Sequence, residues 1–385
     1  MPTTEQPAAI RFAERVLQML DDGRRTATYK FAVLLALMDL CLESTQASGA
    51  PPTMITTAQL ADKVVEIYWN HTLPFHSQRG TSILRQNTTG QAEILSLIAL
   101  FRERYAPDPS TPRWGARLHA PEPYQRLVRE VEWKLIEMPL PRLQTIGGVH
   151  VPILYEISWD STIRRRDVAD YQRGAGGSFS NAVTLLPGVG EHLLQLHMLL
   201  RPLVQRLWAD LVARVNRLEE SQLDIHLFGC SRVPTAPVRR GLWEWQERRC
   251  FYCAGHIGDP DIAHVDHFVP WARYPDDSLD NLVVADARCN TQKNAALAAT
   301  EHLARWARRL DVASPDHDAI AELAQALRWE HQPQKSLGVA RAIYFRLPSD
   351  ARLWLRGQEF TMPDEALIQA ALRARSHPEA DHPSP

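Results

Sequence analysis

The chain has 385 residues, which is long enough for two or three domains with a substantial core. Its 45% hydrophobic and 23% charged residues are typical of a globular protein, and the net charge of -2 does not indicate a nucleic-acid-binding chain, although a sum can conceal local basic patches. The most apolar run, residues 31–38, is too short to span a bilayer, and the first residues do not resemble a signal peptide. We therefore expect a cytoplasmic protein without a membrane partner.

The first half of the chain is predicted to be mostly helical. Apolar residues recur at helical spacing in residues 8–20, 28–43, 56–69, 89–105 and 123–138. Thr56 and Gln59 have capping-box spacing at the start of the third segment, and Pro139 ends the fifth.

The pattern changes between residues 140 and 185. Residues 149–159 are β-branched and interrupted by proline, which suits an edge strand or an irregular segment. The three arginines at 164–166 are either a solvated face or a phosphate contact. The glycines at 174–177 predict a flexible surface loop, because no phosphate-binding fingerprint surrounds them.

A helix is predicted over residues 190–223, with a kink at Pro202. A proline- and arginine-rich linker at 230–240 then marks a domain boundary. Helical patterns return beyond residue 300, and a polar tail is predicted to be disordered.

The segment HVDHFVP, residues 264–270, interrupts the pattern of a buried strand with one aspartate and two histidines. A buried charge is costly unless a partner or a metal holds it. Pro270 ends the strand soon after Asp266 and His267, so these two residues are predicted to lie at a strand end beside a loop.

Five cysteines are present, an odd number that argues against a disulfide framework. Cys250 and Cys253 have zinc-knuckle spacing, and Cys289 follows Asp286 by three residues downstream. The predicted zinc site contains these three cysteines, with Asp286 or His256 as the fourth ligand. In the alternative interpretation the cysteines are small buried side chains and Asp286 is the N-cap of the next helix.

A helix predicted to begin near Asp286 places Asn290 and Lys293 on one face. Strand, loop and helix can then bring an imidazole, a carboxylate, a carboxamide and an ammonium group together. Carboxylate and amide oxygens suit Mg²⁺, a neutral imidazole can deprotonate water, and an ammonium group suits a phosphate oxygen. This combination is suited to metal-assisted phosphodiester hydrolysis.

The residues VDHFVP, DDSLDNLVV and CNTQKN, in this order and spacing, resemble the HNH (ββα-metal) endonuclease family, and are similar to the HNH domain of RNA-guided CRISPR nucleases. The resemblance implies that His267 is the general base and that Asp266 and Asn290 ligate a catalytic Mg²⁺ or Mn²⁺. It also implies that Asn281 braces the loop and orients the histidine, and that Lys293 lies near the phosphate.

Two positions depart from the family pattern. Asp286 replaces the cysteine that is usual in zinc-bearing members, which weakens the zinc prediction but not the catalytic one. His264 is either an additional ligand or part of a structural hydrogen bond. A degenerate HNH fold that is kept as a binding module is the alternative for the whole set.

Basic residues precede and follow the knuckle. Those expected to contact nucleic-acid phosphates are Arg239, Arg240, Arg248 and Arg249. Trp243 and Trp245 lie between them and either stack on bases or pack in the core of the small domain.

The predicted fold is mainly α with a small α+β module. We expect a helical N-terminal domain over residues 1–235 (sensor, scaffold or DNA-positioning region), an HNH nuclease domain with a zinc knuckle over 236–300, a helical extension over 301–375 and a disordered tail over 376–385. The expected substrate is DNA, with an RNA nuclease or a binding module as alternatives. Helical segments similar to those beside HNH modules in other bacterial nucleases favour a role in restriction or anti-phage defence, with either a homo-oligomer or a partner subunit.

Overall fold

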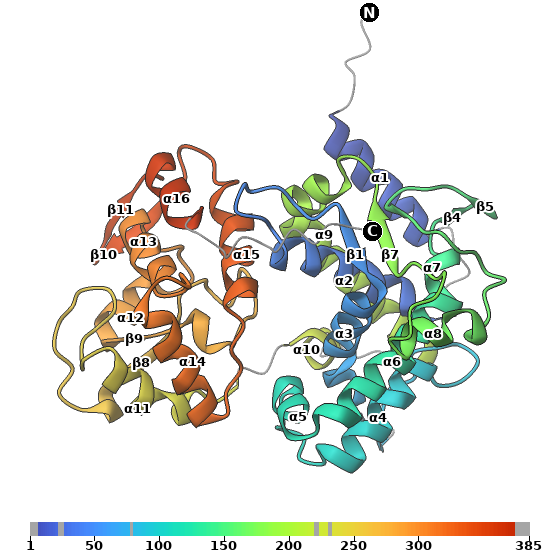
Figure 1. Cartoon of the computed structure of the whole chain (residues 1–385), viewed down its shortest axis with the longest axis horizontal. Coiled ribbons are helices and arrows are strands. Elements are labelled where there is room, and N and C mark those ends of the chain that lie inside the picture. The colour runs from blue at the N-terminus through green and yellow to red at the C-terminus, as the bar shows by residue number, and fades with distance from the viewer. Residues whose placement is uncertain (1–6, 22–26, 78–79, 219–222, 230–232, 374–385) are drawn as a thin grey trace, which may run out of the picture. The chain divides into compact units, whose positions relative to one another are not determined.

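The structure is a computed structural model that describes residues 7–21, 27–77, 80–218, 223–229 and 233–373 (Figure 1). It divides the chain into two compact units, one of residues 1–41 and 51–230, the other of residues 42–50 and 231–385. Helices dominate and the sheets have two or three strands, which confirms a mainly α fold with a small α+β module. The finer division into four parts stays a prediction, and the predicted tail at 376–385 lies outside the described residues.

The first unit is built around helices whose apolar stripes form its core. Its described helices are α1 (Ala8–Asp21), α2 (Tyr29–Glu43, whose last two residues belong to the second unit), α3 (Thr57–Tyr68), η1 (Asn70–Thr72), α4 (Glu93–Tyr105), α5 (Arg113–His119), α6 (Pro121–Glu137), α7 (Pro139–Arg142), η2 (Arg165–Val168), α8 (Ala169–Gln172), α9 (Val189–Asn216) and α10 (Leu223–Phe228). An antiparallel sheet has the strand order β1 (Met54–Thr56), β7 (Ala182–Leu185), β6 (Tyr155–Glu156). Two hairpins complete the unit: β2 (Phe75–Ser77) with β3 (Gly80–Ser82), and β4 (Thr145–Ile146) with β5 (Val149–His150).

Local sequence signals set most helix ends of this unit. The capping box predicted at the start of α3 is present: the Thr56 side chain accepts from the Gln59 backbone N–H, and the Gln59 side chain accepts from Thr56 N–H. The helix predicted over 190–223 is shorter than expected, because α9 ends at Asn216, where Arg217 adopts a left-handed conformation with φ of 55°. Pro202 lies inside α9, and the helix continues through it.

The second unit contains the segment that interrupted the strand pattern. Its described elements are α11 (Ala236–Trp245), η3 (Pro260–Ile262), β8 (His264–His267), η4 (Leu279–Asn281), β9 (Leu282–Ala285), α12 (Ala287–Lys293), α13 (Thr300–Arg308), α14 (Pro315–Leu327), α15 (Pro333–Tyr344), β10 (Leu353–Arg356), β11 (Glu359–Thr361) and α16 (Glu365–Leu372). Helix α11 begins inside the stretch predicted as a linker, because Pro237 fits the first turn of a helix.

A β-hairpin and one helix form the centre of this unit. Strand β8 pairs antiparallel with β9, with Asp266 opposite Val283 and His267 opposite Leu282, and α12 follows β9 after one residue. Behind the hairpin the ring of Phe268 stacks on Trp306, with centroids 4.7 Å apart. Strands β10 and β11 form a second hairpin. No helix in the described ranges is both long enough and apolar enough to cross a membrane.

Candidate active site and metal centre

Asp286 connects β9 to α12, and its two carboxylate oxygens have different partners. Its Oδ1 accepts a hydrogen bond from the Cys289 backbone N–H at 2.8 Å, as an N-cap does. Its Oδ2 lies 3.0 Å from the Sγ of Cys253. The two interpretations of this residue are therefore compatible, because one carboxylate oxygen caps the helix and the other faces the cysteines.

Four side chains form a cluster at this point: Cys250, Cys253, Asp286 and Cys289 have ligand atoms that all lie within 4.8 Å of one another. Ligands of a tetrahedral zinc with bonds near 2.3 Å lie about 3.8 Å apart, so a small contraction would complete the site. His256 is exposed and is not a member of the cluster. Burial raises the pKa of Cys250 to about 11, so a metal that binds here must displace thiol protons.

Asp266 lies on the face of β8 that points toward α12. Its Oδ2 accepts a hydrogen bond from the Tyr252 hydroxyl at 2.6 Å and lies 2.9 Å from the Nζ of Lys293. Burial and the nearby Asp266 charge raise the pKa of Tyr252 well above its ordinary value, so the phenol keeps its proton and donates. Two buried donors therefore hold the carboxylate on one side.

Lys293 ends α12 and points inward. Its side chain has no exposed area, and its Nζ also donates to the His267 carbonyl oxygen at 2.9 Å. The family resemblance implies that this ammonium lies near a phosphate, and in the structure it contacts the Asp266 carboxylate and the His267 carbonyl oxygen. Its contacts position those two residues, because a fully buried cation takes its partners from the protein interior.

His267 points to the other side of the hairpin, as strand alternation requires. Its Nε2 lies 2.8 Å from Oδ1 of Asp277, and only 9% of each side chain is exposed. The sequence analysis did not name Asp277. The only signal was an acidic pair, Asp276 and Asp277, in the loop between the histidine and Asn281.

Asn281 closes the loop that carries Asp277. Its Oδ1 accepts from the Val269 N–H at 2.8 Å, and its Nδ2 donates to the carbonyl oxygens of Val269 at 3.2 Å and Asp276 at 3.0 Å. These bonds brace the loop, and none of them reaches the His267 side chain. Within the described residues, the side-chain hydrogen bond that orients the imidazole comes from Asp277.

The helices after α12 hold the same loop. The Trp329 indole donates to the Asp277 carbonyl at 2.7 Å, and the Leu279 N–H donates to the Glu330 carbonyl at 2.8 Å. The Trp306 indole and the Arg309 guanidinium donate to backbone carbonyls of η4 and β9. The loop conformation therefore depends on residues 300–333 as well as on the hairpin.

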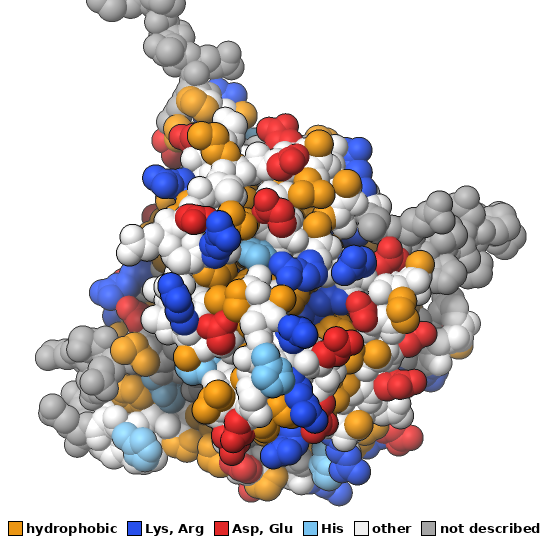
Figure 2. All heavy atoms as spheres, turned by 90° about the vertical axis from the view of Figure 1, so that its left-hand side faces the viewer, with side chains coloured by type: hydrophobic (Ala, Val, Ile, Leu, Met, Phe, Trp, Pro, Cys, Tyr) orange, Lys and Arg blue, Asp and Glu red, His pale blue; other side chains and the backbone are white. Residues whose placement is uncertain are grey.

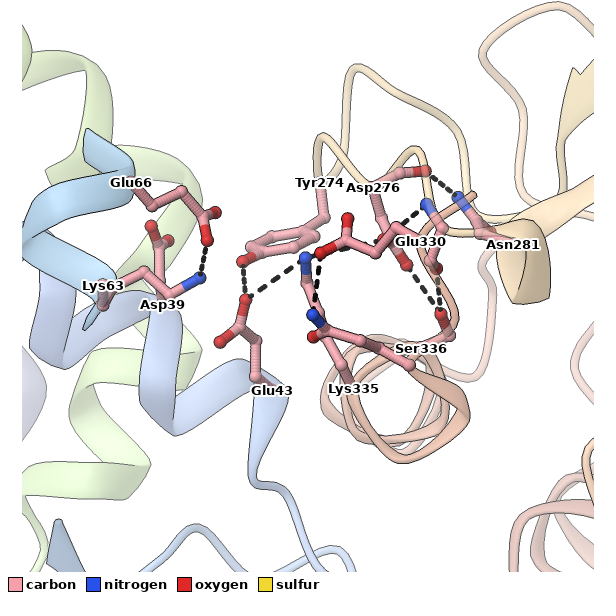
Figure 3. Close-up of polar contacts among 12 residues, drawn as sticks. Asp39, Glu43, Lys63, Glu66, Tyr274, Asp276, Asn281, Glu330, Lys335 and Ser336 are labelled. Carbon is pink, nitrogen blue, oxygen red and sulfur yellow. Dashed lines mark hydrogen bonds and ion pairs between the residues drawn. The ribbon is translucent and has the colours of Figure 1, made fainter. Parts of the chain in front are cut away.

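A buried polar network extends this support (Figure 3). The Ser336 hydroxyl donates to Asp276 Oδ2 at 2.7 Å, and Lys335 Nζ lies 3.6 Å from Asp276 Oδ1. In the same unit the Tyr274 hydroxyl donates to the carboxylate of Glu43, which Lys335 also approaches at 3.8 Å. The carboxylates are balanced by donors, as buried charges must be.

Asn290 lies one turn before Lys293, at the more exposed end of the same helix face. Its side-chain amide lies 3.1 Å from Nδ1 of His264, which shares a strand face with Asp266. The structure therefore brings a carboxylate, an amide and an imidazole toward one side of the hairpin. Carboxylate and amide oxygens suit Mg²⁺ or Mn²⁺, so this donor set fits a hard divalent cation.

The predicted nucleic-acid contacts lie on and after α11. Arg240, Arg248 and Arg249 are exposed, whereas Arg239 is partly buried. Trp243 is buried and donates to the Ile257 carbonyl at 2.8 Å, so it packs in the core. Figure 2 views the side on which Figure 1 draws the second unit, and it shows Lys and Arg side chains gathered across the middle of this face, with acidic side chains among them.

Comparison with known families identifies part of this unit. Residues 250–299 match a family model described as HNH endonuclease. Searches of curated proteins and of solved structures gave no match to the chain. The matched segment contains the cysteine cluster, β8, β9 and α12, but neither the helices that hold the Asp277 loop from behind nor any part of the first unit.

Proposed function

We propose that residues 250–299, which match the HNH endonuclease family model, form a nuclease module, and that the protein is a metal-dependent endonuclease that hydrolyses phosphodiester bonds in DNA. The observation that carries the proposal is the pairing of His267 with Asp277, at a strand end that also carries the Asp266 carboxylate. A buried imidazole held by a carboxylate at a strand end is the arrangement that general-base catalysis needs.

The tautomer of His267 follows from its partner. An ionised carboxylate can only accept a hydrogen bond, so the proton of the neutral imidazole resides on Nε2, next to Asp277. Nδ1 then keeps the lone pair and can remove a proton from water as that water attacks phosphorus. The bond to the leaving oxygen breaks as the new P–O bond forms, and the imidazolium is stabilised by Asp277.

Asp266 and Asn290 would hold the catalytic Mg²⁺ or Mn²⁺, with His264 beside them. When bound, such a cation stabilises the negative charge that develops on the phosphate and leaving oxygen. Lys293 and Tyr252 fix the Asp266 carboxylate from the buried side, so its orientation is set before substrate arrives. Phosphates of the cleaved DNA strand would be contacted by four arginines near the module. These are the exposed Arg240, Arg248 and Arg249 and the partly buried Arg239.

A direct test presents supercoiled plasmid and a structured RNA to the purified protein in parallel, with Mg²⁺, with Mn²⁺ and with a chelator. We expect DNA to be nicked with either metal and to stay intact with the chelator. Cleavage of RNA with intact DNA would overturn the DNA assignment and keep the enzyme. Tight binding without cleavage of either substrate would favour a binding module.

We propose that the cluster of Cys250, Cys253, Asp286 and Cys289 holds a structural Zn²⁺. Elemental analysis of purified protein should find about one zinc per chain. Cys253→Ser should lose the metal, whereas Asp286→Cys should retain it because a thiolate also completes the tetrahedron. Equal zinc content in Cys253→Ser and the parent would contradict the site.

The biological setting that we propose is bacterial restriction or anti-phage defence, based on the similarity of its helical segments to those beside other HNH modules. Cells that carry the gene should plate phage less efficiently than cells that carry the His267→Ala variant. Equal plating over a panel of phages would argue against this setting and leave the chemistry untouched.

A further inference from the structure

A cavity of about 740 Å³ in the first unit is lined mainly by arginines. Its lining residues are Arg126, Arg129, Glu130, Arg165, Ala169, Gln172 and Arg173. The lining contains four arginines and one carboxylate, and Asp170 pairs with Arg173 beside it, so the cavity carries a net positive charge in a chain whose net charge is -2. None of these residues belongs to the HNH module.

One wall of the cavity is a face of α6. Arg126, Arg129 and Glu130 stand at positions i, i+3 and i+4 and therefore project from the same side of the helix. The same stripe continues with Trp133 and Ile136, which form an apolar cluster with the fully buried Val168. This cluster anchors the second wall, η2 and α8, to α6.

Polar contacts tie the second wall to α6 along its length. Gln172 Nε2 donates to the Arg129 carbonyl at 3.1 Å, and the Tyr171 hydroxyl donates to Glu132 Oε1 at 2.9 Å. Arg165 forms an ion pair with Glu130 across the cavity. The cavity is therefore preformed, and a ligand need not order its walls.

The cationic groups are available to an anion. Arg126 and Arg129 are exposed, and their guanidinium groups have no hydrogen-bond or ion-pair partner among the described residues. Arg165 and Arg173 pair with Glu130 and Asp170, but both pairs are solvent-exposed and hence weak. Phosphate oxygens can replace those partners with charge-assisted bidentate contacts.

The segment that follows Arg173, the last lining residue in the chain, has little side-chain bulk. Gly174, Gly176 and Gly177 follow Arg173 directly and adopt positive φ values of 73°, 80° and 117°. A Cβ at Gly174 or Gly176 would have no neighbour within 4 Å, so a ligand can approach the backbone closely there.

We propose that this arginine-lined cavity binds the phosphodiester backbone of the DNA substrate, as a second contact besides the HNH module; this inference rests on the proposed function. Several guanidinium groups along one wall suit a repeated phosphate charge and carry no base specificity. The described lining includes no aromatic side chain on which the base of a free nucleotide could stack. The contact is therefore with the backbone of a polymer.

The test uses the full chain with His267→Ala, which separates binding from cleavage. The affinity for a short labelled DNA duplex is measured over a series of salt concentrations. The cavity variant is Arg126→Gln/Arg129→Gln. The matched control is Arg15→Gln/Arg104→Gln, which removes two exposed arginines elsewhere in the first unit. We expect the cavity variant to raise Kd about tenfold and to reduce the log Kd against log salt slope by about 1.8, since each lost phosphate contact removes about 0.9. The control should match its parent.

Two results would overturn the inference. One is a cavity variant with the same Kd and salt slope as the parent. The other is a variant that loses binding of ATP, used as a nucleotide probe, while its duplex affinity is unchanged. The same substitutions are also made in the protein with His267 intact, and its plasmid cleavage is measured. This measurement distinguishes the proposed nuclease activity from the proposed second DNA contact. A cavity variant that binds and cleaves DNA normally contradicts only the second contact.

Discussion

The side chain that most affects the expected chemistry is Asp277, which pairs with Nε2 of His267 in a nearly buried position. Its backbone is held as well, because the Trp329 indole donates to its carbonyl oxygen. We infer that Asp277 is a positioning residue for the general base. We expect Asp277 to affect the tautomer and orientation of the imidazole rather than the affinity for the substrate.

Asp277→Asn should lower kcat about 10- to 100-fold with little change in duplex affinity, because an amide can donate to Nε2 and so favour the wrong tautomer. Single-turnover cleavage and binding assays measure the two quantities separately. Asp350→Asn, at an exposed position in the same unit, serves as the control. A loss of affinity that accounts for the whole loss of activity would contradict the positioning role.

Lys293 is expected to matter for stability as well as for activity. Lys293→Met leaves the buried Asp266 carboxylate with Tyr252 as its described donor, and removing one partner of a buried ion pair should lower the free energy of unfolding by about 3 kcal/mol. Lys134→Met removes more exposed ion pairs with Glu93 and Glu137 and should cost less than about 1 kcal/mol. Denaturant unfolding followed by tryptophan fluorescence measures both. Equal stability of the two variants would contradict the account of Lys293.

The sequence indicated the residues of the motif, but not the residues whose hydrogen bonds hold them in position. Asp266, His267 and Asn290 could be named because the order and spacing of their motif resemble the HNH family and their side-chain chemistry is distinctive. Asp277 could not be separated from Asp276 and Asp280, since only the loop conformation decides which carboxylate faces the imidazole. Tyr252 was missed because, between two cysteines, it has the appearance of a core aromatic residue.

The loop between β8 and β9 is held by the helices that follow the hairpin rather than by the hairpin alone. Helical periodicity predicted those helices, because apolar spacing is a local property. It could not predict that Trp306, Arg309 and Trp329 would bind the backbone of the loop, since these contacts join residues 26 to 52 positions apart. Helical periodicity also did not predict helix ends that are set by backbone conformation, such as the end of α9 at Arg217.

The contact between His331 and the buried Asp280 predicts a pH dependence for this support. His331 Nδ1 lies 3.0 Å from Asp280 Oδ1, and the carboxylate raises the pKa of His331 above its ordinary value. The contact therefore stabilises the fold below the ordinary histidine pKa, and this contribution is lost as the pH rises through the raised value. Tm measurements on the parent, His331→Gln and the exposed control His119→Gln should find a larger deficit for His331→Gln at acidic than at alkaline pH. A deficit that is equal at both, or larger at alkaline pH, would contradict this assignment.

The chain combines a unit that contains the segment matched by the HNH endonuclease family model with a first unit that carries an arginine-lined cavity. The net charge of the chain does not indicate this cavity, because acidic residues elsewhere balance the charge of its arginines. The sequence named the triple arginine at 164–166 but left it open between a solvated face and a phosphate contact. The packing of η2 on α6 places Arg165 in the same cavity as Arg126 and Arg129, which the sequence pattern alone does not indicate.

We propose His267 as the general base of a DNA endonuclease, and this role decides the chemistry of the whole molecule. The most direct measurement is single-turnover nicking of supercoiled plasmid in Mg²⁺ by the parent protein and by His267→Ala, with equal zinc content and equal Tm established first. We expect the rate constant of the variant to be about 10²- to 10⁴-fold lower than that of the parent, which is the usual contribution of a general base. Nicking at the parental rate by a folded, zinc-loaded His267→Ala protein would contradict it.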